Sequence, residues 1–128
     1  MLSVTARTPL YPTEDASKVM RALLFLFPNG EVEESSDMLE LRTDDMAAFM
    51  ENIRRSRILD AIRSALRQGM DGNRTVFLLN KQVACAGRIS LTEGKVPLGS
   101  IEVTIESEDI EKAIDRIAPM TVNGEEVQ

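Results

Sequence analysis

The chain has 128 residues, and its 15 Lys and Arg against 21 Asp and Glu give a formal net charge of −6 at pH 7. Histidine and tryptophan are absent and Cys85 is the single cysteine, which excludes disulfides within the chain, zinc sites of His and Cys, and catalytic triads that use an imidazole. The negative balance also argues against indiscriminate binding of nucleic acid, so any contact with a polyanion must be local.

Hydrophobic residues make up 43% of the chain and charged residues 28%, which is typical of a soluble globular protein. A domain of this length buries roughly two thirds of the surface of the unfolded chain. The first residues lack the apolar run of a signal peptide, and no stretch approaches the ~18 apolar residues of a membrane span. We therefore expect a cytoplasmic protein without a membrane partner.

The N-terminal part predicts a strand, a helix and a second strand. Apolar and polar residues alternate over residues 2–7, which is the period of a half-buried strand. Thr13 then fits an N-cap, and the helix should run to about Phe27 before the turn at residues 28–30. The next strand should cover residues 31–42, with a polar middle typical of an edge strand. Two strands around one helix favour parallel pairing through a right-handed crossover.

The longest helical region begins at Thr43, and its apolar pattern contains a fault. Apolar residues up to Ile53 share one face, whereas those from Ile58 to Leu66 are centred roughly 165° away at about 100° per residue. One straight helix would bury both faces. The pattern therefore predicts two helices, or a sharp break, with the junction at residues 54–57.

A strand and its return strand should follow the second helical segment. Residues 75–79 are dense in apolar side chains, and Asn80-Lys81 fits a two-residue hairpin turn. The return strand would run from Val83 to Leu91, with alternate side chains on its two faces.

The remaining chain predicts one more strand and one more helix. A connection rich in turn residues spans 92–99, and the alternation over 101–106 predicts a strand with one buried face. Ser107 should then cap a short amphipathic helix that ends before Pro119.

The expected order is β-α-β-α-α-β-β-β-α, which places the chain in the α+β class. We expect a single domain over residues 1–118, with one mixed, mainly antiparallel sheet and helices packed on one face. Residues 119–128 would form a polar C-terminal tail. The opposite face of the sheet would then be exposed or would lie in a homodimer.

Positive charge is concentrated between Arg54 and Arg88, where eight basic residues stand against two acidic ones, a local charge of +6 in a chain of −6. A local field of this kind attracts a polyanion, and the planar fork of arginine binds phosphate oxygens in pairs. The four Phe residues fit core positions, which leaves Tyr11 as the exposed aromatic, so RNA would be recognised by shape rather than by sequence. The candidate RNA-binding residues are Arg54, Arg55, Arg57, Arg63, Arg67, Arg74, Lys81 and Arg88.

Four segments resemble an uncharacterised archaeal protein family, number 201 in the uncharacterised series, that is associated with RNA binding. They are PTEDASKV with the FP that follows, RILDAIRSAL, GNRTVFLLNKQVACAG and PLGSIEVTIES. The resemblance implies a fold like that of the fifth large-subunit ribosomal protein. In some members a P-loop nucleotide-kinase-like domain shares the polypeptide, but this chain has no GxxxxGK[ST], so we expect the stand-alone form. The chain departs from the family at Arg116, near which other members carry an aromatic.

Three alternatives to RNA binding stay open at this point. In the first, the arginines are exposed helix residues that pair around Asp60 and contribute only to solubility. In the other two, the chain is a non-catalytic homodimeric assembly module, or an accessory to a P-loop nucleotide-kinase-like protein. We expect neither an enzyme nor a cofactor or metal site, because no paired acid and base is recognisable, although a pocket lined by Asn80, Lys81 and Arg88 would argue for catalysis.

Overall fold

The computed structural model describes residues 2–93, 99–122 and 125–126. Its elements are, in chain order, β1 (Ser3–Pro9), α1 (Ala16–Leu26), β2 (Glu31–Glu34), β3 (Met38–Thr43), α2 (Ala47–Arg55), α3 (Leu59–Gln68), β4 (Met70–Asp71), β5 (Arg74–Asn80), α4 (Lys81–Cys85), β6 (Ser100–Glu106), α5 (Ile110–Ile117), β7 (Thr121–Val122) and β8 (Glu125–Glu126). The first six strands form one sheet in the order β2-β3-β1-β6-β5-β4, and β7 pairs with β8. Every one of these pairings is antiparallel.

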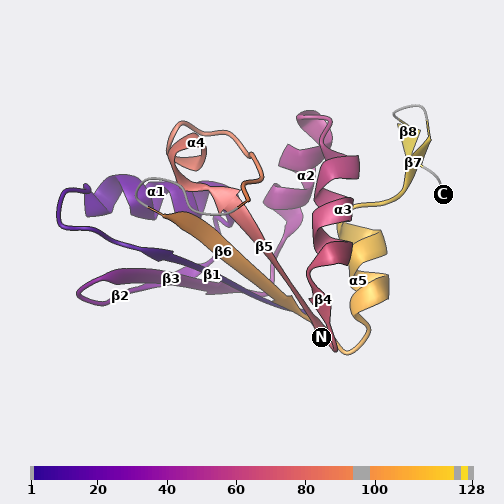
Figure 1. Ribbon diagram of the computed structural model, residues 1–128, viewed down its shortest axis with the longest axis horizontal. Coiled ribbons are helices and arrows are strands. Elements are labelled where there is room, and N and C mark those ends of the chain that lie inside the picture. Colours follow the sequence, from indigo (N-terminus) through magenta and orange to yellow (C-terminus); the bar gives the residue numbers. More distant parts are fainter. Residues whose placement is uncertain (1, 94–98, 123–124, 127–128) are drawn as a thin grey trace.

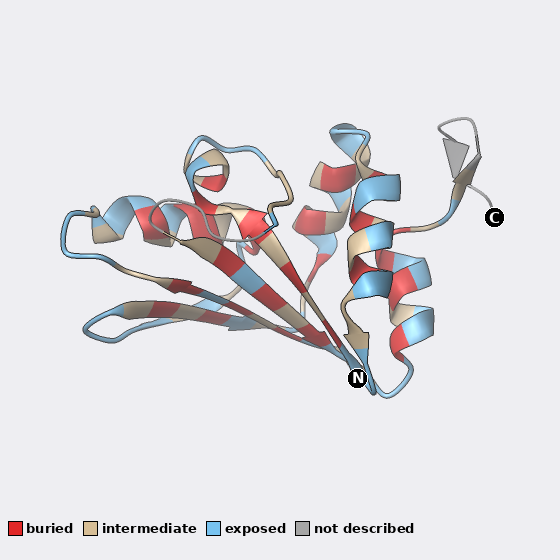
Figure 2. Ribbon diagram, in the orientation of Figure 1, coloured by how far each residue is buried: buried red, intermediate tan, exposed pale blue. Residues whose placement is uncertain are grey.

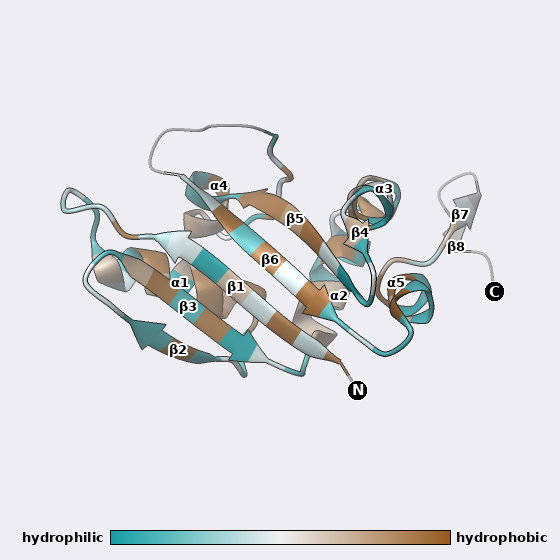
Figure 3. Ribbon diagram, turned by 60° about the horizontal axis from the view of Figure 1, so that its bottom comes forward, coloured by the Kyte–Doolittle hydropathy of each residue, from teal (hydrophilic) through white to brown (hydrophobic). Residues whose placement is uncertain are grey.

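Helices cover one face of the six-stranded sheet (Figure 1). Helices α1 and α4 lie over one half of that face, while α2, α3 and α5 lie beside the other half. Residues alternate along each central strand between buried and accessible positions (Figure 2), and apolar and polar residues alternate along the same strands (Figure 3). The predicted α+β class, with one largely antiparallel sheet and helices on one face, is confirmed.

Three phenylalanines join the two groups of helices at the centre of the core. Phe27 follows α1 and stacks on Phe49 of α2 with ring centroids 5.5 Å apart, and Phe49 in turn lies 6.1 Å from the ring of Phe77 on β5. All three are buried, and truncation of such a side chain to alanine destabilises a protein by about 3–5 kcal/mol. This cluster holds the helical surface above the sheet in a fixed arrangement.

The predicted break in the long helical region is confirmed. Helix α2 ends at Arg55 and α3 begins at Leu59, so the junction falls where the apolar face rotates. Arg57 in the junction has a φ of 58°, the left-handed region that side chains other than glycine rarely adopt. The bend allows both Ile53 and Ile62 to be fully buried.

The single strand expected over residues 31–42 is wrong, because the structure has a hairpin there. Strands β2 and β3 pair antiparallel, and the backbone N–H of Ser35 donates to the carbonyl of Met38 across the turn at 2.9 Å. The polar middle is therefore a turn rather than an edge strand. The hairpin brings β3 antiparallel to β1, so the parallel crossover is also wrong.

The return strand expected from Val83 to Leu91 is also wrong. The Asn80 side chain accepts a hydrogen bond from the backbone N–H of Val83 at 3.0 Å, which starts α4 instead of a hairpin turn. Strand β5 instead pairs along its whole length with β6 and on its other side with β4, while Leu91 of the expected strand forms an isolated bridge to Leu79. Residues 94–98 of the expected 92–99 connection lie outside the described residues.

Two expected helix caps are shifted by two residues, in each case to an aspartate. Asp15 caps α1 in place of Thr13, and Asp109 caps α5 in place of Ser107. Helix α2 starts at Ala47 rather than Thr43 with Met46 at its N-cap, and the Ala47 N–H donates to the Asp45 side chain at 2.9 Å. The hydrogen bonds from Ala47 and Asn29 hold the pKa of Asp45 below its usual range.

Candidate nucleic-acid interface

Lys81 is completely buried at the start of α4. Its Nζ donates to the carbonyl oxygen of Pro9 at 2.7 Å and to the two carboxylate oxygens of Glu14 at 3.0 and 3.3 Å. The same ammonium lies 5.5 Å from the centre of the Tyr11 ring. These contacts fix the segment between β1 and α1 to the first turn of α4. They leave Lys81 no surface through which it could touch a phosphate in this conformation.

Arg63 is also tied into the protein, with 14% of its side chain exposed. Its guanidinium pairs with Asp115 at 2.8 Å and donates to the backbone carbonyl of Ala118 at 3.0 Å. Arg63 therefore fastens α3 to the end of α5. The expected pairing around Asp60 is replaced here, since Asp60 accepts a hydrogen bond from the hydroxyl of Thr121.

Three of the predicted arginines gather at the α2–α3 corner. Arg55 is exposed and pairs with Glu51 one turn earlier at 2.6 Å, a contact that is weak in solvent. Arg57 is exposed at the bend itself. Arg54 is half-exposed and lines a groove of about 1110 Å³ between α2 and α5. The corner thus presents two exposed guanidinium groups and one half-exposed group.

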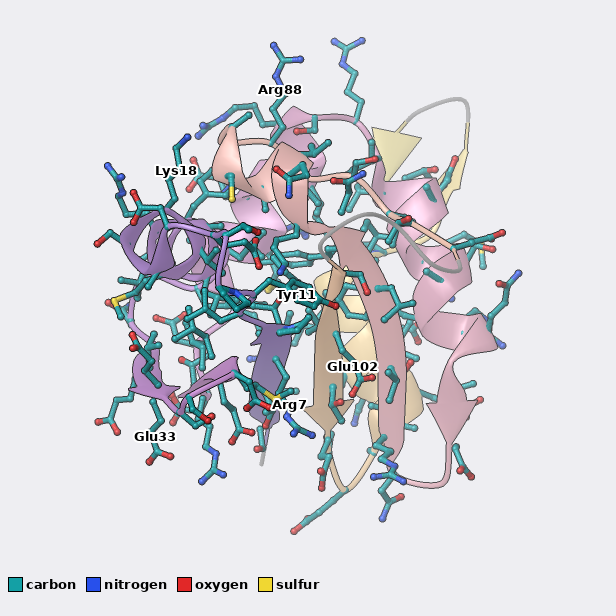
Figure 4. All side chains as sticks on the ribbon, turned by 60° about the vertical axis from the view of Figure 1, so that its left-hand side comes forward. Arg7, Tyr11, Lys18, Glu33, Arg88 and Glu102 are labelled. Atoms are coloured by element: carbon teal, nitrogen blue, oxygen red, sulfur yellow. The ribbon has the colours of Figure 1, made fainter. Side chains whose placement is uncertain are left out.

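Arg67 and Arg74 are exposed at the other end of α3, where the chain turns through β4 into β5. A ten-residue helix is about 15 Å long at 1.5 Å per residue, so this pair is well separated from the corner. Arg88 is exposed three residues after α4 and points away from the body (Figure 4). The eight predicted residues therefore form separate groups rather than one band, and their contact with RNA stays a prediction.

The open face of the sheet carries charge of both signs. Glu40 on β3 forms ion pairs with Arg42 at 2.6 Å and with Arg7 at 3.1 Å, and the hydrogen bond from Arg42 to Glu40 at 2.8 Å is the largest cause of the raised pKa of Arg42. Glu33 and Glu102 lie on the same side of the molecule as Arg7 (Figure 4). Both arginines share the carboxylate of Glu40, so positive charge on this face is balanced by negative charge.

Sequence reasoning missed Glu14 as the partner of Lys81. The two residues are 67 positions apart, so no local pattern connects them. The burial of Lys81 could not be predicted from the sequence either, because an Asn-Lys pair is as compatible with a turn as with the start of a helix.

Among the residues that the structure describes, no group of three or more His, Cys, Asp and Glu is placed to hold a metal ion.

Comparison with known proteins decides the family. A family model described as RNA binding matches residues 3–107. A UPF0201 protein of Metallosphaera sedula is 35% identical over 132 residues, covering 97% of this chain and 92% of that protein. The chain belongs to the UPF0201 family. The crystal structure of the UPF0201 protein from Methanococcus jannaschii is similar with a TM-score of 0.92 and 35% identity, over 98% of this chain and 99% of that one.

One UPF0201 relative is much longer than this chain. A UPF0200/UPF0201 protein of Archaeoglobus fulgidus is 34% identical over 130 residues, which cover 99% of this chain and 40% of the relative.

Within the described part of the present chain, no helix is long and apolar enough to cross a membrane.

Proposed function

We propose that this UPF0201 protein binds structured RNA through phosphate contacts from its exposed arginines, reading shape rather than sequence. The observation that carries the proposal is the match of residues 3–107 to a family model described as RNA binding. That range contains all eight predicted contact residues. Arginine suits the role because its guanidinium binds phosphate oxygens in a planar, two-pronged geometry.

The contacts of the eight predicted residues reduce the number that could bind phosphate. Lys81 and Arg63 are engaged inside the protein, as their contacts with Glu14 and Asp115 require. The α2–α3 corner and the segment after α4 lie on the same side of the sheet (Figure 1). We therefore assign the principal phosphate contacts to Arg55, Arg57 and Arg88, with Arg67 and Arg74 as a second group that a polynucleotide could reach about 15 Å away along α3.

The proposal is tested by a pair of matched double variants. Replacing Arg57 and Arg88 with Gln should lower affinity for a structured RNA at least about tenfold, because each lost charge-assisted hydrogen bond contributes about 1.5–3 kcal/mol. In the control, Lys112 and Arg116 of α5 are replaced with Gln. Both residues are exposed, and their replacement removes two positive charges, as many as the first pair loses. Equal loss from both pairs, or no binding by the unchanged protein at 50 mM salt, would reject the arginine site.

The second candidate is an assembly module, either a homodimer or an accessory to a nucleotide-kinase-like protein. The Archaeoglobus relative supports it, since there the UPF0201 part shares one polypeptide with a second part. The remainder of that relative, produced alone, can be mixed with this chain and examined by light scattering. A mass near the sum of the two proteins in the mixture would favour the partner, and a mass near twice 14.2 kDa for this chain alone would favour the homodimer.

A further inference from the structure

We infer that Tyr11 is a stacking platform for an unpaired RNA base, held in position by the Lys81–Glu14 pair. This inference rests on the proposed RNA binding and adds a second kind of contact to it. The arginines would hold phosphates, and Tyr11 would hold a base.

Tyr11 is the exposed aromatic residue of the described chain. Its relative exposure is 42%, whereas Phe27, Phe49 and Phe77 are buried in the core and Phe25 is half-buried in α1. A base stacks on an aromatic ring whatever its identity, because every base has a π face. One accessible ring therefore adds affinity for unpaired nucleotides without demanding a sequence.

The backbone of Tyr11 is held by hydrogen bonds within its own loop, and its ring lies against Lys81 of α4. The backbone N–H of Tyr11 donates to Glu14 Oε1 at 3.1 Å, and the Tyr11 carbonyl accepts from the Glu14 N–H at 2.9 Å. Glu14 is itself fixed by Lys81, whose ammonium lies 5.5 Å from the ring centre. Because Lys81 has no exposed surface, the part of the ring that it covers points inward, and the accessible part points away from it.

Burial of an ion pair is an inefficient way to stabilise a fold. Removing two charges from water costs several kcal/mol for each ion, and apolar replacements of similar volume are often as stable. The Lys81–Glu14 pair does, however, fasten the surface segment around Tyr11 to the start of α4. A ring that is ordered before binding loses less entropy when a base stacks on it.

Positive charges from two other elements flank the same short helix. The thiol of Cys85, the last residue of α4, lies 3.9 Å from the backbone carbonyl of Lys18, and Arg88 follows α4 three residues later. Figure 4 shows the side chains of Lys18 and Arg88 pointing outward above Tyr11, which lies nearer the centre of the view. Proteins hold single-stranded nucleic acid by combining cations that follow its backbone with aromatic rings on which bases stack.

The single tyrosine makes the inference directly measurable. The chain has one Tyr and no Trp, so its tyrosine emission reports on residue 11 alone. Adding a short single-stranded RNA should quench this emission in proportion to binding. A blunt duplex without unpaired bases should bind through the arginines and leave the emission largely unchanged.

Substitutions at Tyr11 separate stacking from simple burial. Tyr11→Phe keeps the ring and should keep single-strand affinity within about twofold, whereas Tyr11→Leu should reduce it roughly fivefold to a hundredfold. Both variants should bind the duplex as the unchanged protein does. Thermal unfolding of the two variants checks that the comparison is made between folded proteins.

The outcomes distinguish failure of the stacking inference from failure of RNA binding itself. If the unchanged protein binds neither RNA at 50 mM salt, the proposed function fails and the inference fails with it. If it binds single-stranded RNA but the emission is unaltered and Tyr11→Leu binds equally well, the stacking inference alone is overturned.

Discussion

The contacts of Lys81 and Glu14 show that this charged pair joins buried parts of the protein instead of contributing charge to its surface. The lysine reaches a backbone carbonyl of β1 and the carboxylate that precedes α1, so all of its donors are used locally. The sequence predicted Lys81 as a phosphate contact because it lies in the basic segment between Arg54 and Arg88. Charge alone could not reveal a partner 67 residues away.

Removal of one partner of this pair should be strongly destabilising. Lys81→Met leaves the Glu14 carboxylate, which is 6% exposed, without its counter-ion, and Glu14→Gln leaves the buried ammonium with a neutral partner. We expect each single change to lower the free energy of unfolding by about 3–5 kcal/mol and the double change to lower it by clearly less than the sum. Urea denaturation of the four proteins gives the comparison. Strict additivity would show that the two side chains do not depend on one another.

The thiol of Cys85 should react slowly. Burial raises its pKa, and the nearby carboxylate of Glu14 acts in the same direction. Since the thiolate is the nucleophile, a raised pKa lowers the reactive fraction at any pH below it. The rate of alkylation at pH 8 should therefore be lower than that of an unstructured cysteine peptide. A faster rate than the peptide would show that the thiol is activated.

The α2–α3 corner shows what the apolar pattern can and cannot predict at the scale of elements. The rotation of the apolar face between Ile53 and Ile58 was enough to place the break, because burial decides which face of a helix turns inward. The pattern did not resolve the hairpin of β2 and β3 or the helix α4. There the same residues suit two local structures, and pairing with distant strands selects between them.

The left-handed backbone at the corner gives a prediction about stability. Arg57 has a φ of 58°, which costs an L residue about 1–2 kcal/mol, so Arg57→Gly should remove strain that exceeds the extra entropy of an unfolded glycine. We expect the free energy of unfolding to stay unchanged or to rise by up to about 1 kcal/mol. The matched control is Gly72→Ala on the β4–β5 turn, where φ is 62° and an added Cβ would meet nothing within 4 Å.

The control should be destabilised by about 1 kcal/mol, because its entire penalty comes from the backbone. Thermal or urea unfolding monitored by circular dichroism measures both variants. A loss of more than 1 kcal/mol in Arg57→Gly would mean that the arginine side chain supports the corner through contacts that outweigh its backbone strain.

At the scale of the whole molecule, the distribution of charge matters more than its total. The chain carries −6, yet the α2–α3 corner and the segment after α4 expose arginines, while the open sheet face balances Arg7 and Arg42 against Glu40. The acidic remainder would discourage a polynucleotide from wrapping around the protein. Binding should therefore be local, modest in affinity and sensitive to salt.

The salt dependence of RNA binding tests this account most directly. If about four phosphates are neutralised, the logarithm of affinity should fall against the logarithm of salt concentration with a slope near −3.6, roughly a hundredfold between 50 and 200 mM. Replacing Arg57 and Arg88 with Gln should bring the slope to about −1.8, and replacing Lys112 and Arg116 should leave it near −3.6. A slope near zero in the unchanged protein, or the same change in both double variants, would contradict a defined arginine site.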